Sequence, residues 1–196
     1  MKILSRLFII AVVVLSCNHA TEIPVEKEVV VPPAPPEKIA FFPVTDYIKG
    51  QIAEIRNKGI NPHKFTTIHN KLDSAWLKIE QLDTEMAAFL TPIIDSTNFS
   101  ALFAEKKFLD QTINAFTFTY DPVKALPDSV LLTHWDVYVD PEKSTVKRIY
   151  LLKKTTDHKT LQLTWQSDRW CKMVTIADDD KGNAHVEKEV TIKWDF

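Results

Sequence analysis

The sequence predicts an α+β fold in which N-terminal helices pack on a strongly curved antiparallel meander sheet of about six strands. Two observations support this fold class. Between residues 41 and 107, apolar residues recur mostly at helical spacing, whereas from residue 108 onward they recur at every second position. Short turns join the period-two segments, so each strand is expected to pair with the next and the helices to cover one face of the sheet.

The helices are expected near the start of the domain. Apolar residues at helical spacing predict a helix that begins at an N-cap, Thr45, and ends before Gly59. Asp83 begins a second helix that Pro92 stops or kinks. Residues 99–107 are expected to add a further helical turn or two.

Two alternatives remain for the segment between the helices. Residues 64–69 and 74–79 favour a pair of strands, and a single helix over residues 69–82 fits the pattern equally well. The six strands of the meander are predicted by alternation of apolar and polar residues, and they cover residues 115–120, 131–139, 146–154, 161–165, 170–177 and 186–196.

The first sixteen residues have the parts of a secretory signal peptide. Lys2 and Arg6 give a positive start, and Leu7 to Leu15 is an apolar run far shorter than the roughly 20 residues of a membrane-spanning helix. The small Ser16 ends the segment. We therefore expect residues 1–16 to be removed during export.

The segment Val14-Leu15-Ser16-Cys17 resembles the lipobox of bacterial lipoproteins, and this resemblance covers residues 1–17. It implies cleavage before Cys17 and a diacylglyceryl group on the Cys17 thiol. Two or three acyl chains on one residue anchor a protein stably in a membrane. Asn18, in place of the Asp that retains such proteins in the inner membrane, favours the outer membrane. The resemblance thus implies a lipid-anchored protein of the cell envelope.

Residues 17–40 are expected to form a tether, and residues 41–196 a single globular domain. Pro32-Pro33-Ala34-Pro35-Pro36 favours extended polyproline II, which would hold the domain away from the bilayer. An alternative is that this segment is a ligand for the aromatic groove of a partner protein.

Composition excludes several classes of function. The formal net charge is −2, and removal of residues 1–16 leaves 22 basic against 26 acidic residues, which argues against a nucleic-acid partner. Only three glycines are present, too few for a phosphate-binding loop or for a G-x-S-x-G nucleophile elbow. No cofactor is expected.

The sequence contains no motif that identifies catalytic or metal-binding residues. His134 and Asp136 are the best candidates for an enzymatic pair, and no two histidines have the spacing of a metal motif. Asp178 to Asn183 fits a hairpin turn better than a calcium loop, because Gly182 is the fifth residue and not the sixth. Cys171, single once Cys17 is lipidated, is expected to be buried.

These observations favour a non-enzymatic envelope lipoprotein that binds a partner protein or a small apolar ligand. A curved sheet covered by helices can enclose an apolar cleft, which is the basis of the ligand alternative. The competing hypotheses are a hydrolase-like enzyme acting on envelope material, with His134 and Asp136 in its site, and a purely structural spacer. The five tryptophans are expected to lie mainly in the core, and an exposed row of them would favour ligand binding.

Overall fold

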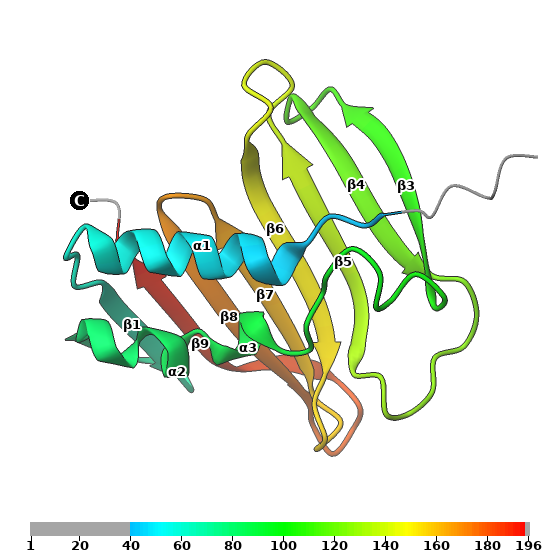
Figure 1. Ribbon diagram of the computed structural model, residues 1–196. Helices are drawn as coiled ribbons and strands as arrows, with labels where there is room; N and C mark the ends of the chain where they lie inside the picture. Colours follow the sequence, from blue (N-terminus) through cyan, green and yellow to red (C-terminus); the bar gives the residue numbers. More distant parts are fainter. Residues whose placement is uncertain (1–39, 195–196) are drawn as a thin grey trace, which may run out of the picture. The chain divides into compact units, whose positions relative to one another are not determined.

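Strands dominate residues 40–194, the part of the chain that the computed structural model describes (Figure 1). The predicted signal peptide, Cys17 and the Pro-rich tether lie outside the described residues. The strands are β1 (His63–Ile68), β2 (Lys71–Trp76), β3 (Phe103–Asp110), β4 (Ala115–Pro122), β5 (Leu132–Val139), β6 (Val146–Lys154), β7 (Thr160–Gln166), β8 (Trp170–Asp178) and β9 (Ala184–Lys193). The helices are α1 (Val44–Asn57), the 3₁₀ helix η1 (Ile79–Gln81), α2 (Leu82–Glu85) and α3 (Ala87–Leu90).

All nine of these strands join one open antiparallel sheet, in the order β2-β1-β9-β8-β7-β6-β5-β4-β3. From β3 to β9 each strand pairs with the next one in sequence, and the β1–β2 hairpin is added beside β9. The first strand of the described chain, β1, and the last, β9, therefore lie side by side near one edge of the sheet.

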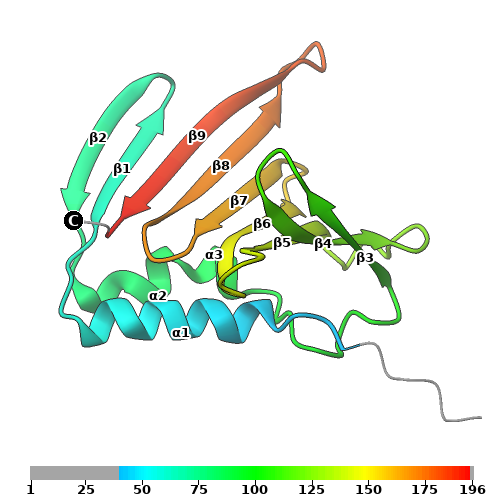
Figure 2. The same cartoon turned by 90° about the horizontal axis from the view of Figure 1, so that it is seen from above.

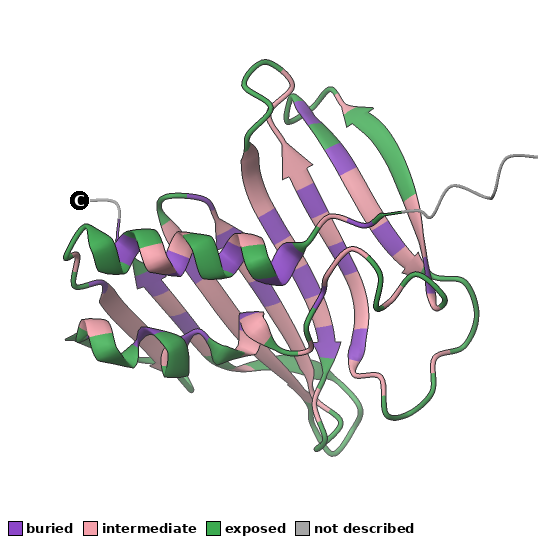
Figure 3. Cartoon of the chain, in the orientation of Figure 1, coloured by how far each residue is buried: buried purple, intermediate pink, exposed green. Residues whose placement is uncertain are grey.

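The helices cover one face of this sheet and leave the other open (Figure 2). We call these two surfaces the covered face and the open face. Helix α1 crosses the covered face with a buried stripe that includes Ile48, Ile52 and Ile55 (Figure 3). Trp135 and Trp165, both fully buried, belong to the same core. Burial of each such large side chain contributes about 1.5–3 kcal/mol, so this layer provides most of the stability.

The prediction of an α+β fold with about six strands is wrong. The described chain is mainly β, with nine strands in one open sheet. The six segments predicted as strands after residue 114 are all strands, but β1, β2 and β3 extend the sheet on both sides. The helical prediction for residues 99–107 fails because this segment pairs with β4 from Phe103 onward, and tertiary pairing overrides a weak local pattern.

Among the local predictions, one open alternative is decided and two predictions are corrected. The strand-pair alternative is right for residues 63–76, while the second predicted helix is divided into the short α2 and α3. Thr45 is not an N-cap, because α1 already begins at Val44. The buried Thr45 hydroxyl instead accepts a hydrogen bond of 2.8 Å from the backbone N–H of Ile94, which ties α1 to the segment after α3.

Within residues 40–194, no helix has both the length and the apolar character needed to cross a membrane.

Candidate functional site

A mainly apolar cavity opens on the covered face, between the end of α3 and the ends of β6 and β7. Its volume is about 500 Å³, within the range of about 300–1,000 Å³ that is typical of ligand sites. Side chains from five separate segments line it, among them Ala88, Phe99, Val130, Leu131, Leu161 and Lys153. We call this space the Lys153 cavity.

Strand alternation places Lys153 in this cavity. Ile149, Leu151 and Lys153 occupy every second position of β6, and all three are buried on the covered face. Lys153 is only 6% exposed, and its Nζ donates hydrogen bonds to the backbone carbonyl oxygens of Ala88 and Thr91 near the end of α3. An ammonium group is thus fixed in the wall of an apolar space.

The Lys153 ammonium has no counter-charge among the residues that the structure describes. Burial lowers its pKa from the ordinary 10.5 to about 8. An ammonium has three N–H groups, and the two carbonyls use two of them. The third N–H and the positive charge remain for another acceptor. Sequence reasoning missed this residue because Lys153 and Lys154 are adjacent, and only the register shows which one points inward.

A second cavity, of about 780 Å³, adjoins the first. Val130, Leu131 and Thr155 line both, so the segment before β5 forms a common wall. The second cavity also contains charged side chains, including Lys124 and Asp128. The mainly apolar Lys153 cavity is the better fit for an apolar molecule.

The predicted pair of His134 and Asp136 does come together, on the open face. His134 Nε2 lies 3.1 Å from Asp136 Oδ2, and His134 Nδ1 lies 2.9 Å from Asp121 Oδ1 on β4. Asp136 also accepts hydrogen bonds from the hydroxyls of Thr119 and Tyr138. Asp121 was missed because only the pairing of Thr119 with Asp136 places it opposite His134.

Both ring nitrogens of His134 are therefore held by carboxylates. The hydrogen bond to Asp136, with the further contact to Asp121, raises the pKa of His134 and favours the imidazolium. Burial alone would raise the pKa of Asp136, but the hydrogen bonds from His134 and Thr119 keep it below its usual range. A general base needs an unprotonated nitrogen that can reach the substrate, so this cluster is better suited to joining β4 and β5 than to catalysis.

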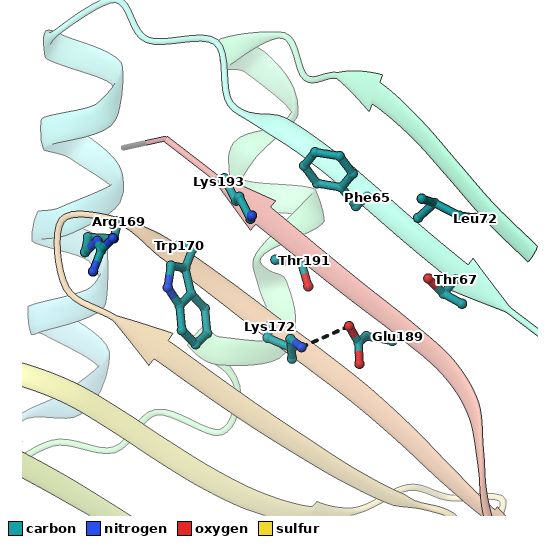
Figure 4. A pocket seen from close by; sticks show the side chains of 9 residues that line it. All are labelled: Phe65, Thr67, Leu72, Arg169, Trp170, Lys172, Glu189, Thr191 and Lys193. Atoms are coloured by element: carbon teal, nitrogen blue, oxygen red, sulfur yellow. Dashed lines mark ion pairs between the residues drawn. The ribbon is translucent and has the colours of Figure 1, made fainter. Parts of the chain in front are cut away.

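A further cavity lies on the open face over β1, β9 and β8 (Figure 4). It has a volume of about 460 Å³ and combines aromatic side chains with charged ones. Lys172 pairs with Glu189 at 2.9 Å, and the ammonium of Lys193 lies 5.5 Å from the centre of the Phe65 ring. Because these charges already have partners on the sheet, the region resembles a solvated sheet surface.

Cys171 and the segment from Asp178 to Asn183, which the sequence analysis also considered, have structural roles. Cys171 is fully buried, as expected, and burial raises the pKa of its thiol. In the turn after β8, Asp179 Oδ1 accepts hydrogen bonds from the backbone N–H groups of Lys181 and Asn183, at 2.9 and 2.8 Å. Over residues 40–194 no cluster of three or more His, Cys, Asp or Glu side chains could hold a metal ion.

The tryptophans divide between the two faces. Trp135, Trp165 and Trp194 are buried, whereas Trp170 is half-buried and Trp76 is 63% exposed. The prediction of a mainly buried set is right for three of the five, and no continuous exposed row is formed.

Comparisons with family models, with curated proteins and with solved structures found no match for this chain.

Proposed function

We propose that this protein is a lipid-anchored protein of the bacterial cell envelope that binds a small apolar ligand in the Lys153 cavity. The lipobox-like segment that ends at Cys17 supports the anchor, and Asn18 favours the outer membrane. The observation that carries the binding function is a mainly apolar space of about 500 Å³ with one buried ammonium in its wall.

The size of the cavity fits a single alkyl chain. Each methylene that leaves water contributes about 0.8 kcal/mol, so a chain of about ten carbons gains at most about 8 kcal/mol. Association costs at least about 4 kcal/mol in lost translational and rotational freedom. A purely apolar ligand would therefore bind weakly, and a polar contact at one end would add both affinity and orientation.

Binding is favoured over the two competing hypotheses. A hydrolase would need His134 as an acid or base, and both of its ring nitrogens are engaged by Asp121 and Asp136. A structural spacer would need no cavity, whereas five segments of this chain converge around the Lys153 cavity.

The intact mass of protein extracted from its own membrane tests the anchor. We expect loss of residues 1–16 and a gain of diacylglyceryl and acyl groups, both absent in Cys17→Ala. A cleaved but unmodified chain would contradict lipid anchoring and leave ligand binding untouched.

Photo-crosslinking tests the binding site. The full chain in lipid nanodiscs is irradiated with a decan-1-ol that carries a diazirine on its chain, and the labelled peptides are mapped by mass spectrometry. We expect labels on peptides that contain Val130, Thr155 or Leu161. Val130→Trp fills the cavity and is expected to remove most of this labelling.

Val123→Trp is the matched control, because Val123 lies on the same connection, is 57% exposed and lines neither cavity. Equal labelling in Val130→Trp and Val123→Trp, or labels scattered over the open face, would contradict the proposal.

A further inference from the structure

We infer that the ligand of the Lys153 cavity is a single-chain amphiphile with a carboxylate head, bound by the Lys153 ammonium. This inference rests on the proposed function and adds the chemical class of the ligand. It is argued from the hydrogen bonds of Lys153, from the charges around the cavity and from the separation of polar and apolar groups within it.

The hydrogen bonds of Lys153 leave room for one more acceptor. Its Nζ donates to the carbonyl oxygens of Ala88 and Thr91, and the third N–H has no acceptor among the described residues. The two carbonyls fix the ammonium in place but carry no full negative charge. A carboxylate oxygen at the third position would complete the hydrogen bonding and neutralise the charge.

The charges around the cavity select an anion. Lys153 and Lys154 are the only titratable side chains in its lining, so every full charge there is positive. The elements packed against Lys153, which are α3, β5 and β7, contribute no acid to the lining. A cationic head would be repelled, and a neutral head would leave the buried ammonium without a counter-charge.

The apolar part of the lining fits the chain of such a ligand. Phe99, Val130, Leu131 and Leu161 surround the space next to the ammonium. A buried, partly desolvated ammonium attracts a carboxylate more strongly than an exposed one does, because water screens the pair less. Burial lowers the pKa of Lys153 to about 8, and no charged group of the described chain offsets this effect.

The test compares two probes that differ only in the head group. The full chain in nanodiscs is labelled with diazirine-bearing decanoate and with the matching decan-1-ol at pH 7. The two probes partition differently into lipid, so the labelling of each variant is divided by that of the wild type for the same probe. Lys153→Met removes the charge, and Lys143→Met is the control, because Lys143 is exposed in the turn before β6 and lines neither cavity.

We expect Lys153→Met to lower labelling of the cavity by decanoate at least about tenfold, the typical effect of losing a hydrogen bond between charged groups, and to change labelling by decan-1-ol less than twofold. Lys143→Met is expected to change neither by more than twofold. Unchanged decanoate labelling in Lys153→Met would overturn the carboxylate and leave the cavity as a site for neutral ligands. Absence of cavity labelling by both probes in the wild type would refute the proposed function itself.

If Lys153→Met does not fold, a pH series on the wild type tests the inference instead. Partial desolvation at the bilayer raises the pKa of the decanoate carboxyl, so decanoate labelling of the cavity is divided by decanoate labelling of the nanodisc lipid at each pH. Lys153, with a pKa of about 8, loses its proton between pH 7 and pH 10. Decanoate labelling is expected to fall several-fold as pH rises, with decan-1-ol labelling constant. Constant labelling by both probes would overturn the inference.

Discussion

Each face of the sheet holds one shielded basic side chain, and the two side chains differ in their partners. On the open face, His134 lies between Asp121 and Asp136, which use both of its ring nitrogens. On the covered face, Lys153 has only backbone carbonyls as partners within the described chain. The open face therefore neutralises its cation internally. The covered face holds an ammonium group that has no counter-charge among the described residues while it is protonated, and this difference is the basis of the proposed binding site.

The aromatic side chains show the same contrast. Trp135 on the covered face is fully buried and stacks on Tyr120 with ring centroids 4.4 Å apart. Trp76 on the open face stacks on His63 at a similar 4.5 Å but is 63% exposed. Similar ring contacts are thus expected to contribute very different amounts to the free energy of unfolding, because the stability comes from the apolar surface removed from water.

The largest effect is expected for Trp135→Ala. Loss of this side chain leaves a cavity among Tyr120, Phe103 and Phe41, and large-to-small changes of aromatic core residues cost about 3–5 kcal/mol. Urea unfolding followed by circular dichroism measures the change. A loss below about 1 kcal/mol would mean that the covered face is not the stability-determining layer.

The next effect is a pH dependence that Lys153 imposes on stability. The folded-state pKa is lowered to about 8, so between pH 8 and pH 10.5 the unfolded chain binds a proton at Lys153 that the folded chain does not. Stability therefore rises with pH in this window, by about 3 kcal/mol at 1.36 kcal/mol per pKa unit. The unfolding free energy of the wild type is expected to rise by that amount relative to Lys153→Met, because other titrating groups cancel in the difference. The exposed Lys154→Met serves as the control, and a pH-independent difference would show that Lys153 is solvated.

A smaller effect is expected for Asp136→Asn. Loss of the main partner of His134 is expected to lower the pKa of His134, which NMR titration of the ring carbons measures, and to cost about 1–2 kcal/mol. The stability difference is full between about pH 4 and pH 6.5. It declines as pH rises through the raised pKa of His134 or falls through the lowered pKa of Asp136.

Asp121→Asn is the comparison variant, with a weaker effect because the Asp121 side chain is 39% exposed and that of Asp136 only 13%. Equal effects of the two variants, or no shift of the His134 pKa in either, would show that Asp136 is not the main partner of His134.

The smallest effect is expected for Trp76→Ala, the same substitution as Trp135→Ala on the opposite face. Because Trp76 is mostly exposed, its removal is expected to cost less than about 1 kcal/mol in urea unfolding. A cost close to that of Trp135→Ala would show that the open face is packed against something in solution, and the contrast between the two faces would be lost.

Alternation predicts strands well where one face is buried. In β7 and in the second half of β9 the apolar residues repeat at every second position, and both segments were identified from the sequence. The pattern is missing in β2, whose six residues are all exposed, and in β3, an edge strand with mostly exposed residues after Glu105. Such strands form because a neighbour offers backbone hydrogen bonds, a property that the segment itself does not encode.

The candidate site was less predictable than the sheet. His134 and Asp136 are two positions apart on one strand, so their proximity follows from the sequence alone. Asp121 joins them only through the register of β4 against β5, and Lys153 meets Ala88 through a contact that spans 65 residues. Sites assembled from distant segments in this way leave no local signature.

The pairing of β1 with β9 has a consequence for how the chain folds. The hydroxyl of Tyr47 in α1 shares a hydrogen bond of 2.8 Å with the hydroxyl of Ser167, which lies 120 residues further along the chain. In the described sheet, β9 is the strand that pairs with the β1–β2 hairpin, and an isolated two-stranded hairpin is marginal in water. The N-terminal third of the domain therefore cannot acquire its final structure until residue 193 has been synthesised. Because such long-range closures slow folding, a nascent or truncated chain is expected to be an easy substrate for proteases, and only the complete domain to resist them.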